Sequence, residues 1–219
     1  MTGYTNFRVM LRNIPEPRPP ARDHELIQIV DAALAETARK SGSRLACRPG
    51  CTPCCIGPFR INQLDAARLQ QGLRDLQKVD PARARRVRKR AEDSVARLVR
   101  SFPGDPVTGV LDEGAEADEK FADFANDEPC PVLDRETGLC DLYESRPMTC
   151  RVFGPPIRSE GGLGVCELCF QGASQEEIEE CEMIPDANGL EEELLREMEK
   201  TTGHPGDTIV AFSLVQSQR

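Results

Sequence analysis

The chain alternates between stretches with an apolar residue at every third or fourth position and stretches that lack this period. Apolar residues recur at helical spacing in residues 23–40, 62–77, 80–102 and 188–200. Such an i, i+3, i+4 repeat places the apolar side chains on one face of a helix. The sequence therefore predicts four amphipathic helices at these positions.

Helix-start signals support these boundaries. Asp23 and Asn62 stand where side-chain caps are favoured, and Asp80 is followed by Pro81, a cap with proline at the first helical position. A further short helix is predicted from Ser174, because S-Q-E-E is a capping-box pattern. We expect all four polar residues to cap helices.

The segments between the helices predict little regular structure. Residues 130–133 and 139–143 flank a polar turn at 134–138, which is typical of a short β-hairpin. Residues 103–128 are acidic and are predicted to form a loop with one short turn around Phe121 and Phe124. Residues 207–215 are apolar and β-branched, so we expect a strand there.

Charge is unevenly distributed along the chain, whose net charge is −9. Residues 81–100 carry eight Lys or Arg against two acidic residues, and residues 105–144 carry thirteen Asp or Glu against two basic residues. A general nucleic-acid binder would usually be basic, so we expect no nucleic-acid partner. The basic helix face could touch RNA or DNA, but pairing with the acidic stretch is the favoured interpretation.

Cysteine is the unusual component, at 10 of 219 residues. That share is below the level of a secreted disulfide scaffold and far above the needs of an ordinary core. The first twelve residues lack the apolar run of a signal peptide, and no stretch approaches 18 apolar residues. We therefore expect a cytoplasmic protein with no membrane partner, whose thiols bind metal or carry redox chemistry.

Four of the cysteines fall within nine residues, at Cys47, Cys51, Cys54 and Cys55. A two-residue spacing lets a tight turn aim two thiolates at one metal, and the intervening prolines and glycine favour such a turn. Neighbouring side chains of an extended segment point to opposite sides. Two alternatives follow for Cys54 and Cys55. Either one of them binds the metal while the other packs in the protein, or each binds a different metal centre.

Further along, C-P-V-L begins at Cys130, and C-D-L-Y-E-S-R-P-M-T-C-R runs from Cys140 through Cys150 to Arg151. With the first cluster, this arrangement resembles the YkgJ-like cysteine-cluster family, whose pattern is CxxCxxCC, a helix, CP-x-L and C-x-x-Y-x-x-RP-x-x-CR. The match covers about residues 47–151, and its first gap has three residues where the family has two. The resemblance implies zinc or iron chelation, with these ligand candidates: Cys51, Cys54, Cys55, Cys130, Cys140 and Cys150, to which we add Cys47.

A second two-residue spacing joins Cys166 and Cys169 in a glycine-rich loop. These two cysteines are either further ligands or buried thiols that close a turn, and we keep them among the candidates. Cys181 is predicted to be a small buried apolar residue. The complete set of predicted metal ligands is Cys47, Cys51, Cys54, Cys55, Cys130, Cys140, Cys150, Cys166 and Cys169.

The donor set is all thiolate, because His24 and His204 stand at a helix start and in a tail. Four thiolates suit Zn²⁺ and an Fe–S cluster equally, so spacing does not decide between them. Ten thiols suffice for two sites. Arg146 and Arg151 either offset the charge of the centre or pair with the acidic stretch.

These features predict an α+β fold, a mainly helical single domain in which Cys-rich loops and a short β-hairpin are organised around metal. We expect an irregular proline-rich arm at 1–21, the cysteine-cluster metal-binding domain at 22–205 and a tail at 206–219. The expected function is metal binding with a structural or metal-handling role. The family also resembles the flagellin lysine N-methylase, so a metal- or cluster-dependent enzyme is the alternative, and a redox protein using Cys51 and Cys54 is the third.

Overall fold

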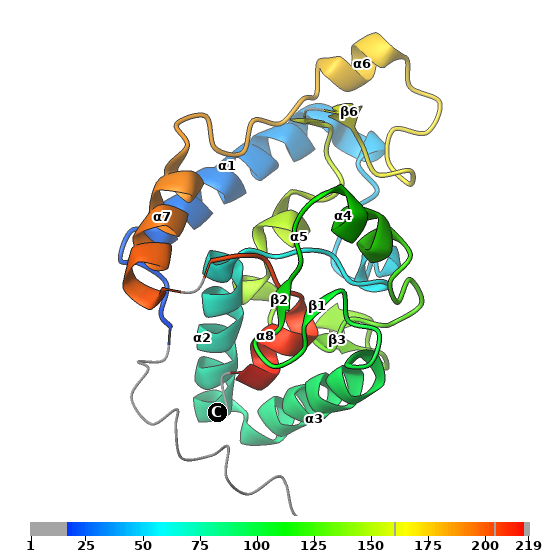
Figure 1. Cartoon of the computed structure of the whole chain (residues 1–219). Coiled ribbons are helices and arrows are strands. Elements are labelled where there is room, and N and C mark those ends of the chain that lie inside the picture. Colours follow the sequence, from blue (N-terminus) through cyan, green and yellow to red (C-terminus); the bar gives the residue numbers. More distant parts are fainter. Residues whose placement is uncertain (1–16, 160, 204, 217–219) are drawn as a thin grey trace, which may run out of the picture.

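The computed structural model describes residues 17–159, 161–203 and 205–216 (Figure 1). Helices dominate, and short hairpins connect them, as predicted for a mainly helical α+β chain. The helices are α1 (Asp23–Ser41), α2 (Gln63–Val79), α3 (Pro81–Leu98), α4 (Ala115–Ala122), α5 (Met148–Val152), α6 (Gln175–Glu179), α7 (Leu190–Thr202) and α8 (Val210–Gln216). The strands are β1 (Gly104–Asp105), β2 (Val110–Leu111), β3 (Leu133–Asp134), β4 (Leu139–Cys140), β5 (Ile157–Ser159) and β6 (Gly162–Gly164), which pair as three antiparallel hairpins in the described part of the chain.

Three of the four predicted caps are confirmed. The Asn62 side chain accepts a hydrogen bond from the Asp65 amide at 2.9 Å, and Asp80 does the same for Arg83 at 2.9 Å. Ser174 forms the predicted capping box at the start of α6. Each of these side chains satisfies a backbone N–H that has no partner within its own helix.

The prediction for Asp23 is wrong. Arg22 occupies the N-cap of α1 without a side-chain cap, and Asp23 is the first helical residue. The Asp23 carboxylate is buried and pairs with Arg68 of α2 instead. The ion pair with Arg68 therefore replaces the capping hydrogen bond. A local capping pattern cannot reveal this partner, because Arg68 belongs to another helix. The third helix also ends earlier than predicted, at Leu98.

The predicted strand at 207–215 is also wrong, because most of this segment forms α8. Residues 208–214 are all buried, and α8 packs against both α2 and α3. A helix surrounded by core is apolar on all sides, so its sequence lacks the polar stripe that identifies an amphipathic helix. Only Thr208 retains strand-like pairing, through two hydrogen bonds of 2.9 Å with Ile61.

Residues 103–128 are more ordered than the predicted loop. They contain the hairpin β1–β2 and the two-turn helix α4. The predicted hairpin at 130–143 is confirmed as β3–β4, which pairs Leu133 with Cys140. Helix α5 and the hairpin β5–β6 were not predicted, since both are too short to show a period.

The core divides between the two halves of the molecule. Helices α2, α3 and α8 pack together in the lower half of Figure 1, while α1, α5 and α7 form the upper half. Leu69 and Leu73 of α2 pack in the apolar cluster of the lower half, and Leu64 and Ala67 of the same helix pack in the apolar cluster of the upper half. Helix α2 therefore joins both halves. A separate small cluster lies beneath α6, around Cys169, Phe170 and Cys181.

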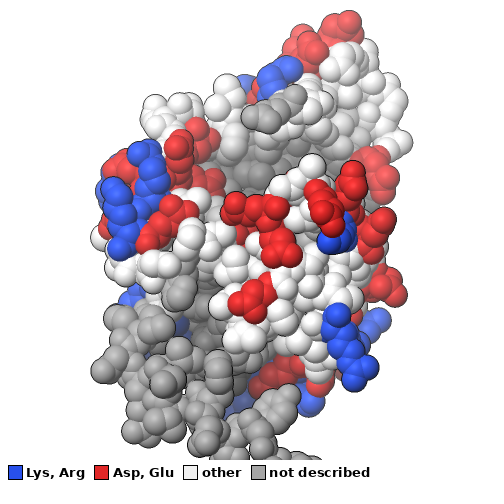
Figure 2. All heavy atoms as spheres, in the orientation of Figure 1, with Lys and Arg blue, Asp and Glu red and all other residues white. Residues whose placement is uncertain are grey.

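The basic face of α3 pairs with the acidic stretch, as predicted. Arg83 and Arg90 both form ion pairs with Asp141. Arg97 forms an ion pair with Glu128, with 2.6 Å between Nη2 and Oε1. Other acidic side chains gather over α4 and the loop before it (Figure 2). None of the described helices is long and apolar enough to cross a membrane.

Candidate metal centre

The ten cysteines are all free thiols. Nine of them lie in two neighbourhoods, which meet at the 3-10 helix η3 (Pro53–Cys55). We define the hairpin group as Cys54, Cys130, Cys140 and Cys150, and the loop group as Cys47, Cys51, Cys166 and Cys169. Cys55 adjoins Cys54, and Cys181 is buried, as predicted, in the apolar cluster that also contains Cys169 of the loop group.

Backbone hydrogen bonds assemble three parts of the hairpin group. The Cys130 amide donates to the Cys55 carbonyl at 2.8 Å, which ties the Cys130 segment to η3. The Cys130 carbonyl in turn accepts from the Leu133 amide at 3.0 Å, and Leu133 faces Cys140 across β3–β4. Three sequence-distant cysteine positions therefore share one hydrogen-bonded unit.

The fourth member, Cys150, is positioned by helix α5. Asp65 of α2 accepts a hydrogen bond from the Met148 amide at the start of α5, at 2.8 Å. Arg151, whose side chain is almost completely buried, pairs with Asp31 of α1 at 2.8 Å. These two contacts anchor α5 to α2 and to α1, and so they fix where Cys150 lies.

A buried ion-pair network supports this anchorage. Arg68 contacts both Asp65 and Asp23, and all three residues are buried. Burial raises the pKa of Asp65 to about 6, although the neighbouring guanidinium of Arg68 opposes the shift. Sequence reasoning missed this network, because nothing in the local pattern marks Asp65 and Arg68 as a buried pair.

The thiols of the hairpin group influence one another electrostatically. Burial raises the pKa of Cys150, and three nearby thiols raise it further: those of Cys130, Cys140 and Cys54. Burial likewise raises the pKa of Cys130 to about 12, and the Cys140 thiol adds to the shift. Four thiols from η3, the segment before β3, β4 and α5 therefore lie close enough to disfavour one another's charge.

The pair Cys54–Cys55 does not adopt the extended conformation assumed from the sequence. Both residues lie in η3, and a hydrogen bond between their thiols raises the pKa of Cys54, with burial adding to it. The expectation that they point to opposite sides is therefore wrong. Cys54 also raises the pKa of both Cys150 and Cys47, which places its thiol between the two groups.

The loop group draws on the segments around Cys47 and Cys166. Burial raises the pKa of Cys47 to about 11, and neighbouring thiols contribute to the rise. Besides Cys54, these neighbours are Cys51, Cys169 and Cys166. The structure thus brings the first cluster near the C-x-x-C pair that lies over one hundred residues further along.

The chemistry of both groups fits a thiolate-bound metal, since each supplies four sulfur donors. Among the residues described, no three His, Cys, Asp or Glu side chains already stand where they could hold an ion together. Binding an ion therefore requires deprotonation of the thiols and movement of the side chains or loops that carry them. The groups therefore fit a thiolate-bound metal in two respects: their donors are neighbours, and all of the donors are sulfur atoms.

The two arginines of the second cysteine motif, Arg146 and Arg151, have different contacts. Arg151 pairs with Asp31 of α1, which lies outside the acidic stretch that one of the two alternatives named as its partner. The Arg146 guanidinium lies 4.0 Å from the centroid of the Tyr143 ring. Burial raises the pKa of Cys140, and the charge of Arg146 opposes that rise. Arg146 is therefore near enough to offset negative charge on the hairpin group.

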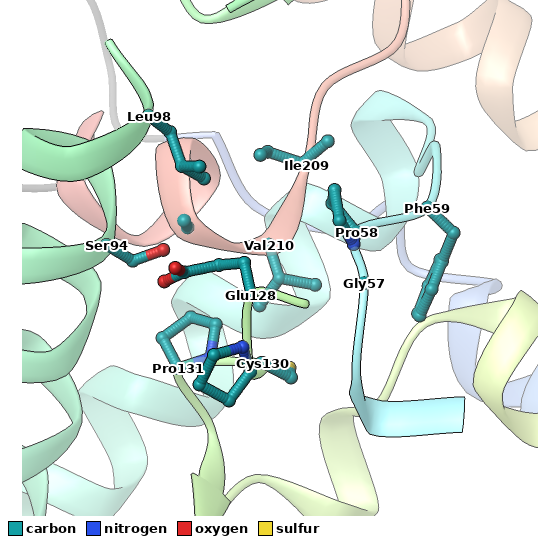
Figure 3. A pocket seen from close by; sticks show the side chains of 12 residues that line it. Gly57, Pro58, Phe59, Ser94, Leu98, Glu128, Cys130, Pro131, Ile209 and Val210 are labelled. Carbon is teal, nitrogen blue, oxygen red and sulfur yellow. The ribbon is translucent and has the colours of Figure 1, made fainter. Parts of the chain in front are cut away.

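A small cavity borders the hairpin group behind Cys130 (Figure 3). Its volume is about 20 Å³, which accommodates roughly one water molecule. The walls are mainly apolar, and the Ser94 hydroxyl and Glu128 carboxylate face each other on one side (Figure 3). Despite its partial burial, hydrogen bonding chiefly from Arg97 lowers the pKa of Glu128.

The structure describes one of the two histidines. His24 shares a hydrogen bond with the Ala21 carbonyl at 2.7 Å, at the start of α1. His204 lies outside the described residues, as do residues 1–16 of the predicted N-terminal arm. The expected domain boundaries remain predictions.

Comparison with known proteins adds one match. The family model CxxCxxCC, described as "Putative zinc- or iron-chelating domain", matches residues 46–182. This range is more than half of the chain and contains all ten cysteines, including the three beyond the motifs recognised in the sequence. No curated protein matches the chain, and no solved structure does. The chain belongs to the CxxCxxCC family of zinc- or iron-chelating domains.

Proposed function

We propose that the protein binds zinc or iron through the hairpin group, with Cys54, Cys130, Cys140 and Cys150 as thiolate ligands. One observation carries the proposal: four thiols from η3, the segment before β3, β4 and α5 lie near one another, and three of them raise the pKa of the fourth, Cys150. Cys55 is the alternative donor to Cys54, because the two thiols share a hydrogen bond. A set of four sulfur ligands would make a closed site, which suits a structural or metal-handling role.

The surroundings of the hairpin group support thiolate formation. Four thiolates on Zn²⁺ leave a net charge of −2. Arg90 lowers the pKa of Cys130, and Arg83 and Arg146 lower that of Cys140, each against the larger effect of burial. Positive charge at these positions would partly neutralise the loaded centre. Because the ligands must remain reduced, we also propose the cytoplasm as the working compartment.

Metal analysis of the full-length protein tests the proposal. The chain is purified anaerobically, its absorption spectrum is recorded, and bound zinc, iron and sulfide are measured. We expect a colourless zinc protein or a brown protein with iron and sulfide. Cys150→Ser and Cys130→Ser should each reduce the metal content, whereas the control Cys181→Ala should retain it. Unchanged metal content in both ligand variants, or no metal at all, would refute the assignment.

The enzyme and thiol-redox alternatives stay predictions. The methylase alternative rests on family resemblance alone. The redox alternative requires Cys51 and Cys54 to exchange electrons as a pair, whereas the Cys54 thiol is hydrogen-bonded to Cys55. Reversible oxidation of Cys51 and Cys54 in a metal-free protein would favour it over metal binding.

A further inference from the structure

A second set of four thiols joins two loops that are distant in the sequence. We infer that the loop group, Cys47, Cys51, Cys166 and Cys169, forms a second and separate metal centre that takes a thiophilic divalent cation such as Zn²⁺ or Fe²⁺. This inference extends the metal binding proposed above and rests on the same thiolate chemistry. Its ion would clamp residues 45–51 against residues 165–170.

Gly154 provides the first argument, because both loops meet on it. A Cβ atom at Gly154 would lie 2.8 Å from Cβ of Cys47 and 3.3 Å from its sulfur. The Gly154 carbonyl accepts a hydrogen bond from the Cys166 amide at 3.4 Å. Cys47 and Cys166 are thus held against one residue, whose φ of +124° and tight packing both require glycine.

The turn that carries the C-x-x-C pair provides the second argument. The Cys169 amide donates to the Cys166 carbonyl at 2.8 Å, which closes the turn and brings the two cysteines together. Phe170 follows with a φ of +55°, a left-handed conformation that is unfavourable for a bulky residue. Its amide donates to the Arg44 carbonyl at 2.8 Å, so the strained residue links this turn to the Cys47 loop. Strain of this kind persists where surrounding contacts impose it, and it concentrates at functional sites.

Hydrogen bonds to sulfur provide the third argument. The backbone amides of Ala46 and Cys47 donate hydrogen bonds to the Cys169 thiol. The Cys166 thiol also shares a hydrogen bond with it. Amide donors directed at a sulfur stabilise its thiolate form, which is the form that binds metal. A buried thiol that served only for packing would need no such donors.

The two groups are also separate neighbourhoods. Cys130 and Cys140 pack against the core cluster of α2, α3 and α8. Cys166 and Cys169 belong to a different apolar cluster, with Phe170 and Cys181. Two four-sulfur centres on either side of η3 therefore account for eight thiols, with Cys55 beside Cys54 and Cys181 as packing.

Cobalt titration of the reduced, metal-free full chain tests this inference. Co²⁺ alone is the probe, because its thiolate charge-transfer bands report sulfur ligation. We expect two equivalents for the wild-type chain, one for Cys47→Ser, one for Cys169→Ser and one for Cys150→Ser. The double variant Cys150→Ser/Cys169→Ser should bind none. Cys181→Ala, a buried thiol beside Cys169 that is not assigned as a ligand, should still bind two.

The outcomes separate the two proposals. One equivalent that is lost in Cys150→Ser and retained in Cys169→Ser refutes the second centre and leaves the proposed function intact. No binding by the wild-type chain refutes both. If a serine variant fails to fold, alkylation of the zinc-loaded wild-type chain with mass-spectrometric readout decides. Zn²⁺ should protect Cys47, Cys51, Cys166 and Cys169, and their full alkylation would overturn the inference.

Discussion

The hairpin group and the loop group contain the same number of thiols in different surroundings. Cys130 and Cys140 pack against the core that α2, α3 and α8 share, and Cys150 lies on a helix anchored by a hydrogen bond to the buried Asp65 and by the Arg151–Asp31 ion pair. The loop group is held by turns, by Gly154 and by backbone bonds between irregular segments. The folded core therefore positions the first group, while the second depends on contact between two loops.

This difference teaches that two sites of similar chemistry can depend on metal to different degrees. The apolar cluster beneath the loop group is small, with Cys169, Phe170 and Cys181 as its buried members. Little apolar burial is available there to offset the entropy of ordering the loops. We expect bound metal to supply more of the local stability in the loop group than in the hairpin group.

Metal removal should produce the largest effect. Apparent binding free energies of structural zinc in small domains are about 10–16 kcal/mol, so chelation removes more stability than any single substitution. Hydrogen exchange should show that residues 45–51 and 165–170 lose protection first, while α2 and α3 keep theirs. An equal loss of protection in all these segments would show that the two groups depend equally on metal.

Arg68→Met should be the most damaging substitution on the hairpin side. It leaves the buried carboxylates of Asp23 and Asp65 without their cation, at a cost of about 3–5 kcal/mol in the free energy of unfolding. Arg39→Met is the matched control, since Arg39 pairs with Glu36 on the exposed face of α1, where solvent screens the pair, and should have a much smaller effect. Urea unfolding measures both. Equal effects would mean that the network does not support α5.

Most of the helical architecture could be predicted from the sequence, because an amphipathic period and a cap are local signals. Asn62 and Asp80 show this, since each caps the helix that follows it. Asp23 and α8 show the limit. Asp23 pairs with a residue of another helix, and α8 is surrounded by core, so tertiary contacts decide both.

The residues of the candidate site could be predicted from the sequence, but their arrangement in space could not. The spacing of the cysteines and the family resemblance together identified nine candidate thiols, but neither indicates which of them meet in space. The division into two groups depends on long-range contacts such as that of Gly154 with Cys47. The buried partners Asp31 and Asp65 were missed for the same reason, because their contacts join helices far apart in the sequence.

Asp141→Asn should have a smaller effect on the hairpin side. The Asp141 side chain is almost completely buried next to Cys140, and it pairs with both Arg83 and Arg90. Asparagine keeps the shape and loses the charge, so we expect a cost of about 2 kcal/mol. Asp75→Asn, which removes an exposed pair with Lys78, should cost less than about 1 kcal/mol. Thermal unfolding compares the two, and similar shifts would contradict a special role for Asp141.

Gly154→Ala should have the smallest effect on stability and the most local one. The new Cβ would meet Cys47 at 2.8 Å, whereas at Gly172, which also has a positive φ, nothing lies within 4 Å of a Cβ. Both alanine variants carry backbone strain, so the difference between them, about 1 kcal/mol, isolates the contact with Cys47. Gly154→Ala should also weaken Co²⁺ binding to one of two equivalents, and Gly172→Ala should leave both unchanged. If Gly154→Ala weakens the equivalent that Cys150→Ser removes, the loop group is not a separate centre and the contrast between the two groups fails.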